Sequence, residues 1–464
     1  MGADDTTERA PISYRALQCW ARMAAAVIYR RVEVTAEPNV PTDRPTILAA
    51  NHSNALADVA VIVAKMPRFP HFLAAASWWK HRHARVLFRL GGVLPVHRAS
   101  DGSGTIHNAS TFEACQAALA LGEHLAIFPE GVMGPGHALL PIKTGAARIG
   151  LSAAADGEVR GVVIVPLGLV YEDRGRFRSS AEVHFGEPIE MDRWVDRYRD
   201  DPADAVRRVT DLLSDRLAAV TVNGGSNELA TLISRSATMV LADSAGSAGE
   251  QVSTARRNAL RRRLAAALDT ANGEDDGGDV GPLAAAVAAH LLDLARLGFD
   301  ESQSLDVARG SIRARRLTGL VLWSPVAALG ALVNAPAVVV VGLLSPLVRL
   351  DGWQATTKGV GGTFMLPVTW TTGIVLGSRR FGLRRAAVVT VAGAASGLTT
   401  LSWLDRVKEV QRASAIAAAR RTRPKEVAQA QRSRAEVARQ VEALVGAGGS
   451  VPSVVKTRRS VWEG

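Results

Sequence analysis

Between Thr46 and Ile189, short apolar runs alternate with stretches whose apolar residues have helical spacing. Five apolar runs predict strands, namely ILAAN, HFLAAAS, LAIFPEG, GVVIVPLGLVY and AEVHFGEPI. Three intervening stretches predict helices, namely ADVAVIVAK, STFEACQAALALG and KTGAARIGLSAAA. This alternation indicates an α/β domain, a mixed sheet flanked by helices, which we assign to residues 41–200.

The chain outside this domain divides into further segments. Residues 13–33 predict an amphipathic helix, packed on the domain or lying on a membrane surface, so we assign 1–40 to an N-terminal helix. Residues 201–316 are charged, rich in Ala and Arg, and predict a helical region with a flexible linker near 271–281. Residues 405–464 form a basic tail, either solvated helices or a segment attracted to anionic lipid.

The region 317–404 is predicted to be membrane-associated and helical. Its first 32 residues carry no charge, and a membrane span needs about 20 apolar residues. Three prolines and an asparagine interrupt this run, so it predicts either one tilted span or a bent hairpin that does not cross. The basic flanks at 313–316 and 379–385 and the basic tail cannot all be cytoplasmic if every segment crosses once, which leaves the topology open.

Length and composition narrow the class of protein. The 464 residues exceed what one compact core usually holds. The net charge of +11 predicts an anionic partner, either nucleic acid or an acidic membrane face. The two cysteines lack metal-ligand spacing, and they indicate a reduced compartment without a disulfide framework. The N-terminus lacks the apolar core of a secretory signal.

The segment NHSNALAD places a histidine and an aspartate at the edges of two apolar runs. A histidine can act as a general base near neutral pH, and a nearby aspartate orients it and stabilises the imidazolium. Six positions along an ideal helix correspond to a rotation of about 600°, so His52 and Asp58 meet only if His52 lies in a loop. The alternative is a turn histidine beside an aspartate that caps the next helix.

Several later residues could bind an anion. Arg98 ends an apolar segment, and its guanidinium can bind a phosphate with two hydrogen bonds. Lys143 and Arg148 lie near the start of a small-residue helix, where cations and backbone N–H groups form anion sites, although an exposed helix face is the alternative. Glu130 and Gly131 follow an apolar run, and Glu130 could instead hold a turn through backbone N–H groups.

Together these stretches resemble the glycerolipid acyltransferase superfamily over about residues 45–190. The resemblance rests on four blocks in the family's order, namely NHSNALAD, GGVLPVHR, FPEG and VVIVPLGL. Five residues separate His52 from Asp58, where the commonest motif has four, and this variant resembles the eukaryote-type branch that acylates glycerol 3-phosphate or dihydroxyacetone phosphate at sn-1. Val132 and Met133 replace the Thr-Arg of many members, so another cation must bind the phosphate or the acceptor differs.

The resemblance implies a mechanism and roles for the residues. His52 would deprotonate the acceptor hydroxyl, Asp58 would orient His52, and the hydroxyl would attack the thioester of acyl-CoA or acyl-carrier protein. Arg98, with Lys143 and Arg148, would hold the acceptor phosphate. Glu130 would bind an acceptor hydroxyl, and backbone N–H groups near Gly131 would stabilise the oxyanion. No metal or other cofactor is required.

The implied function is transfer of a fatty acyl group to the sn-1 hydroxyl of glycerol 3-phosphate in phospholipid biosynthesis. The alternatives are acylation of lysophosphatidic acid or another lysolipid, and a non-catalytic membrane-anchored scaffold. We expect acyl-CoA, a phosphorylated three-carbon acceptor and membrane lipids as partners, with the catalytic domain on the cytoplasmic side of a membrane. Nucleic acid is not expected, because the basic tail has no interleaved aromatic residues before Trp462.

Overall fold

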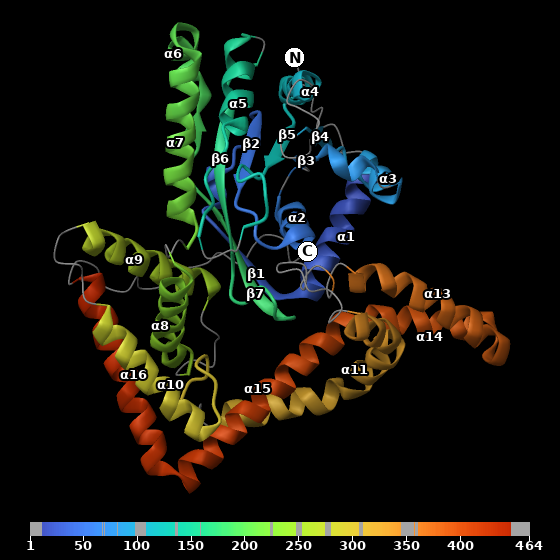
Figure 1. The fold of residues 1–464 in the computed structure, drawn as a ribbon. Coiled ribbons are helices and arrows are strands. Elements are labelled where there is room, and N and C mark those ends of the chain that lie inside the picture. Colours follow the sequence, from blue (N-terminus) through green and yellow to red (C-terminus); the bar gives the residue numbers. More distant parts are fainter. Residues whose placement is uncertain are drawn as a thin grey trace, which may run out of the picture. The chain divides into compact units, whose positions relative to one another are not determined.

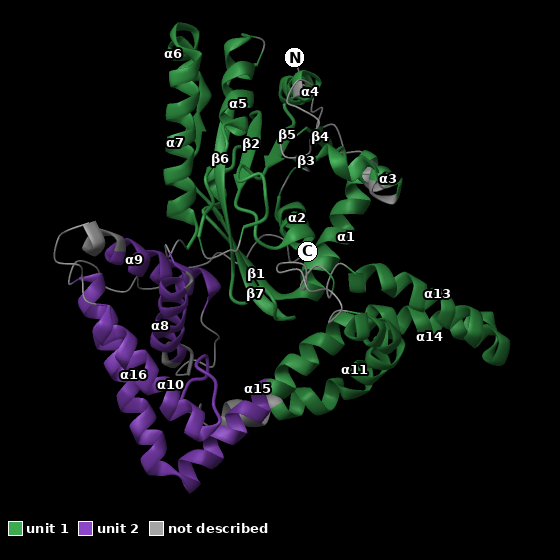
Figure 2. Cartoon of the chain, in the orientation of Figure 1, with its two compact units in different colours: residues 1–223, 316–408 green, residues 224–315, 409–464 purple. Residues whose placement is uncertain are grey.

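The computed structural model describes most of the chain as helices and strands (Figure 1). The described residues are 12–66, 68, 70–80, 82–97, 108–134, 138–157, 159–222, 226–246, 253–273, 280–305, 310–344, 357 and 361–446. They form two compact units (Figure 2), unit 1 with residues 1–223 and 316–408 and unit 2 with residues 224–315 and 409–464.

Unit 1 is built on an eight-stranded mixed sheet of order β1-β7-β6-β2-β5-β3-β4, with β8 paired to β6. The strands are β1 (Tyr29–Thr35), β2 (Thr46–Ala50), β3 (Pro70–Ala75), β4 (Leu94–Val96), β5 (His124–Ile127), β6 (Val163–Tyr171), β7 (Ser179–Phe185) and β8 (Ile189–Glu190). Strands β6, β2, β5, β3 and β4 are mutually parallel, as are β1 and β7, whereas β6 pairs antiparallel with β7 and β8. The predicted α/β class is therefore confirmed.

Helices cover both faces of this sheet. Leu48 and Ala50 of β2 pack into a core with α1 (Ile12–Ile28) and α2 (Ala55–Lys65). Ile47 and Ala49 pack into a second core, with α4 (Asn108–Ala120), α5 (Gly145–Ala155) and α7 (Pro202–Val220). Burial on both faces explains why the central strands are continuously apolar rather than alternating. The remaining helices that accompany the sheet are α3 (Arg82–Leu90) and α6 (Val195–Asp200).

The predicted N-terminal helix over 13–33 is wrong at its C-terminal end. Helix α1 ends at Ile28, and the following residues form β1, which pairs in parallel with β7. The segment YRRVEVT has the β-branched residues that suit a strand, and its backbone hydrogen bonds go to a partner about 150 positions away. Strands β4 and β8 were also not predicted.

The apolar region begins with a single helix. Helix α11 (Gly310–Leu344) continues through Pro325 and Pro336. Pro325 frees the carbonyl of Val321, and the Ser324 hydroxyl donates to that carbonyl at 2.8 Å, which helps the helix to continue. Asn334 donates to the carbonyls of Gly330 (2.8 Å) and Gly393 (3.1 Å), and so joins α11 to α14 (Leu383–Ala395).

By length and composition, residues Leu317–Leu344 of α11 could cross a membrane. Helix α14 and the following α15 (Gly397–Thr422) meet the same criterion only as a pair bent by 45°. Helix α13 (Gly362–Phe381) lies between α11 and α14 in the sequence. The described chain thus has a helical C-terminal region with one or two possible membrane spans.

Unit 2 is helical. Its helices are α8 (Asn227–Gly246), α9 (Thr254–Gly273), α10 (Gly281–Leu297) and α16 (Pro424–Val445), together with the end of α15. His290 of α10 is fully buried, and its Nδ1 lies 2.9 Å from the Ser433 hydroxyl, while Arg434 donates to its Nε2 (3.2 Å). A basic residue of the tail thus contributes to the interior of this bundle. The boundaries of the five predicted segments stay predictions.

Candidate active site

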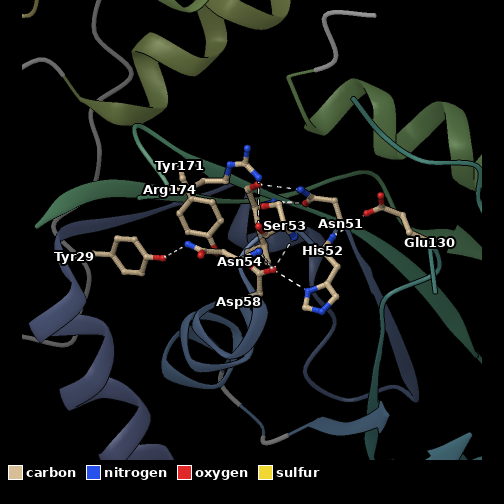
Figure 3. Close-up of polar contacts among 10 residues, drawn as sticks. Tyr29, Asn51, His52, Ser53, Asn54, Asp58, Glu130, Tyr171 and Arg174 are labelled. Carbon is tan, nitrogen blue, oxygen red and sulfur yellow. Dashed lines mark hydrogen bonds and ion pairs between the residues drawn. The ribbon is translucent and has the colours of Figure 1, made fainter. Parts of the chain in front are cut away.

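A buried carboxylate lies at the start of α2 (Figure 3). Asp58 Oδ2 lies 2.9 Å from His52 Nδ1 and accepts the backbone N–H groups of Ser53 and Asn54, each at 2.8 Å. Its Oδ1 accepts a hydrogen bond from the Tyr171 hydroxyl. Asp58 has no exposed surface, so these donors replace the water that an ionised carboxylate needs. Asp58 lies in the first turn of α2 and is not its N-cap, which is Asn54, so the carboxylate holds the histidine and the two backbone N–H groups that precede the helix.

The orientation of the His52 imidazole follows from this contact. Because the carboxylate can only accept, Nδ1 carries the hydrogen and Nε2 has the free lone pair. The side chain is 21% exposed, and no described residue hydrogen-bonds to Nε2. The ring stacks on Phe128, with centroids 4.0 Å apart and an interplanar angle of 18°. His52 therefore presents one basic nitrogen away from its buried partner.

Glu130 holds the backbone of His52. Its Oε1 accepts the N–H of His52 at 2.8 Å, and its Oε2 accepts the N–H of Leu140 at 3.1 Å. Only 3% of Glu130 is exposed. Burial raises the pKa of Glu130, and the two backbone hydrogen bonds oppose that shift. These contacts correspond to the alternative in which Glu130 holds a turn through backbone N–H groups.

The sheet brings these residues together. His52 follows β2, Glu130 follows β5, and Tyr171 ends β6, and the three strands are adjacent and parallel, so their carboxyl ends meet at one edge. Asn51 extends the pairing beyond β2, since its side chain accepts the N–H of Leu169 (2.7 Å) and donates to that residue's carbonyl (3.1 Å). The loop after β2 is thus fixed to β6.

Two buried tyrosines, which the sequence analysis did not predict, form hydrogen bonds at the loop between β2 and α2. The rings of Tyr29 and Tyr171 stack with centroids 5.4 Å apart, and Asn54 donates to the Tyr29 hydroxyl at 2.9 Å (Figure 3). Burial, followed by the Asp58 charge, raises the pKa values of both phenols well above the ordinary value, so both stay protonated. Arg174, also missed, donates to the Ser53 carbonyl at 3.4 Å. These contacts join positions 25 to 121 residues apart, and no local motif marks them.

Two other predicted residues, Gly131 and Lys143, lie at the turn that contains Glu130. The Lys143 N–H donates to the Pro129 carbonyl at 2.9 Å, and a Cβ added to Gly131 would lie 2.7 Å from Lys143 Nζ. The Lys143 ammonium therefore lies against the turn that contains Glu130. The Gly131 N–H donates to the Phe128 carbonyl at 3.0 Å and is thus already engaged.

The other two predicted cations are Arg148 and Arg98. Arg148, in α5, lies over the ring of Phe112 of α4, with its guanidinium carbon 5.3 Å from the ring centroid. Arg98 lies outside the described residues. The structure thus joins His52, Asp58 and Glu130 by hydrogen bonds, places Gly131 and Lys143 next to Glu130, and engages Arg148 with α4.

The acyltransferase family model matches residues 31–170 of this chain. The matched segment includes His52, Asp58 and Glu130.

Curated relatives share part of this domain. Glycerol-3-phosphate O-acyltransferase 2 of Saccharomyces cerevisiae is 37% identical over 119 residues, which cover 25% of this chain and 16% of that protein. Glycerol-3-phosphate O-acyltransferase 1 of the same yeast is 39% identical over 109 residues, which cover 22% of this chain and 14% of that protein. The chain therefore matches less than a fifth of the length of these relatives.

A solved structure is also similar in part. The 1-acyl-sn-glycerophosphate (LPA) acyltransferase of Thermotoga maritima is 20% identical, and the similarity covers 44% of this chain and 80% of that chain. The TM-score between the two structures is 0.30.

The Tyr171 contact gives a prediction about stability. Tyr171→Phe removes the buried donor to Asp58 and keeps the ring, so we expect the free energy of unfolding to fall by about 1.5–3 kcal/mol. Unfolding of the purified protein in detergent, followed by heat or denaturant, measures this change. Tyr198→Phe is the matched control, because no described residue hydrogen-bonds to the Tyr198 hydroxyl. Equal losses in the two variants would contradict the role given to Tyr171.

Proposed function

We propose that this protein is a membrane-associated glycerol-3-phosphate acyltransferase that acylates the sn-1 hydroxyl, with acyl-CoA or acyl-carrier protein as donor. The observation that carries the proposal is the hydrogen bond between His52 Nδ1 and Asp58, which leaves Nε2 as an accessible base at the carboxyl edge of the sheet. The choice of acceptor is supported by the names of the yeast relatives and by the five residues between His52 and Asp58.

The reaction follows from the position of that base. His52 Nε2 takes the proton of the acceptor hydroxyl as the oxygen attacks the thioester carbonyl carbon. The buried Asp58 carboxylate stabilises the imidazolium that results. The tetrahedral intermediate then collapses, the carbon–sulfur bond breaks, and the leaving thiolate takes the proton back from His52. The products are the acyl ester and the free thiol, and no acyl-enzyme forms.

For the other residues, we propose two kinds of role. Glu130 positions His52, because both of its oxygens bind backbone N–H groups and it is almost fully buried, rather than binding an acceptor hydroxyl. Lys143 binds the acceptor phosphate, because its exposed ammonium lies beside the Glu130 turn and just before the N-terminus of α5.

The apolar helix α11 supports membrane association. Four residues, RARR at 313–316, immediately precede the possible span Leu317–Leu344, on the side of the span where the catalytic domain lies in the sequence. Basic residues beside a span favour the cytoplasmic side, so we propose that the catalytic domain lies in the cytoplasm.

The proposal predicts which acceptor is used and which residue the transfer needs. Purified protein in detergent, given long-chain acyl-CoA, should acylate glycerol 3-phosphate, and His52→Ala should lower kcat by about 100- to 10,000-fold through loss of the general base. His184→Ala is the matched control, because the His184 side chain is 23% exposed, close to the 21% of His52, and lies in β7.

Other outcomes of this assay would contradict the proposal. Acylation of lysophosphatidic acid alone would move the protein to the second acylation step. Activity unchanged in His52→Ala would remove His52 as the base. No transfer from acyl-CoA or acyl-carrier protein to any acceptor would favour the scaffold.

Alanine substitutions of Lys143 and Arg148 should differ in their effect on the KM for the acceptor. Lys143→Ala removes the cation beside the Glu130 turn, and we expect the KM for glycerol 3-phosphate to rise about tenfold or more with little change in the KM for acyl-CoA. Arg148→Ala, which removes a cation engaged with Phe112, should change the acceptor KM much less. Initial rates at varied glycerol 3-phosphate measure both. Equal effects of the two substitutions would contradict the assignment of Lys143.

A further inference from the structure

One stretch of the catalytic domain is basic without interruption. Residues 59–100 include 7 lysines and arginines and no aspartate or glutamate. At the frequency of the whole chain, 44 acidic residues in 464, about four would be expected in these 42 positions. Such a stretch attracts an anionic partner wherever its side chains are exposed.

Four of these seven cations lie in the short 3₁₀ helix η2 (Ala76–Lys80) and in α3, and all four are exposed. The two pack as one piece, because the rings of Trp79 and Phe88 lie 4.9 Å apart and Arg85 Nε donates to the Trp79 carbonyl at 3.0 Å. Residues 82, 85, 86 and 89 share one face of α3 by helical spacing, and all four are exposed. We call the following set the η2–α3 surface: Trp78, Lys80, Arg82, Arg85, Val86 and Arg89.

The chemistry of this surface combines cations with exposed apolar groups. Val86 is 60% exposed and Trp78 is 43% exposed. The cations of the same surface are Lys80, Arg82, Arg85 and Arg89. None of these cations forms an ion pair with a carboxylate of the described chain. By contrast, Arg207 and Arg208 of α7 both pair with Asp204. Arginines with no ion pair to a described carboxylate, next to a tryptophan and an aliphatic side chain, fit the interface of an anionic bilayer, where the cations meet phosphates and the apolar groups enter the headgroup region.

The η2–α3 surface begins at the catalytic edge of the sheet. Strand β3 runs parallel to β5, and η2 follows the last residue of β3, so η2 leaves the sheet at the edge where Glu130 follows β5. Aromatic rings connect β3 to His52. The ring centroids of Phe72 in β3 and Phe128 lie 6.3 Å apart, and Phe128 stacks on His52. Figure 1 shows α3 at the end of the sheet that carries β3 and β4.

We propose that the η2–α3 surface docks the catalytic domain on an anionic phospholipid bilayer, with its arginines at the headgroup phosphates and Trp78 and Val86 inserted beside them. This contact is separate from α11, and it orients toward the lipid the edge of the sheet where His52 and Glu130 lie. The proposal rests on the proposed function in one respect, because a lipid-linked acyl substrate explains why the surface lies beside the candidate site. The test of the surface does not measure catalysis.

The test measures the depth of one side chain. The full chain is reconstituted in vesicles of phosphatidylcholine, or of equal parts of phosphatidylcholine and phosphatidylglycerol, with a polarity-sensitive fluorophore on Val86→Cys in a background of Cys19→Ser and Cys115→Ala. In the anionic vesicles the emission should shift to the blue and resist a water-soluble quencher, and salt should weaken both effects. Replacing Arg82, Arg85 and Arg89 with Gln should lower the ratio of docked to undocked protein about fivefold for each arginine removed.

Two controls separate this contact from general attraction. A probe on Leu121→Cys, which is 77% exposed in the turn before β5 at the opposite edge of the sheet, should stay in water in both vesicles. Replacing Arg193, Arg197 and Arg199 with Gln removes the same charge near α6 and should leave the Val86 probe docked.

Three results would overturn the proposal. The Val86 probe could be as accessible as the Leu121 probe in both vesicles, or its depth could be unchanged when the three arginines are replaced. A response to added RNA without a response to vesicles would assign the surface to nucleic acid. Docking that persists when no acceptor is acylated would contradict the proposed function but not this surface.

Discussion

The site depends on the burial of one carboxylate. Removing an ionised carboxylate from water costs several kcal/mol unless donors surround it. Asp58 meets that requirement with two backbone N–H groups, the His52 imidazole and the Tyr171 hydroxyl. These bonds also hold Ala55 at a φ of 45°, a left-handed conformation that costs a residue other than glycine about 1–2 kcal/mol. The turn from β2 into α2, the start of α2 and the tautomer of His52 are therefore fixed together.

The support for this carboxylate extends through unit 1. Asn54 binds the Tyr29 hydroxyl, and the backbone carbonyl of Tyr29 accepts from the Arg178 guanidinium at 3.1 Å. Arg178 also donates to Asp405 of α15 at 2.6 Å, in a pair whose side chains are 12% and 16% exposed. A chain of contacts thus runs from the loop after β2 to the helix that follows the apolar region.

The sequence predicted the parts of the site that local patterns carry. The five apolar runs became strands because each is buried within one sheet, and the loop position of His52 followed from its spacing to Asp58. Residues whose role depends on distant partners were not predicted, because no short motif marks them. Tyr29 fell in a segment that resembles a helix and pairs with β7 instead, Tyr171 was one more apolar position of β6, and the contacts of Glu130 with His52 and Leu140 needed the folded loops.

The central claim is that Asp58 acts through His52, and a double-mutant cycle tests it most directly. Acyl transfer would be measured for Asp58→Asn, His52→Ala and the double variant, with melting temperatures confirming that each is folded. Residues that act as one unit show losses that do not multiply, so Asp58→Asn should lower kcat strongly in the native chain and hardly at all when His52 is already alanine. Losses that multiply in the double variant would mean that Asp58 acts independently of His52, and would contradict this account.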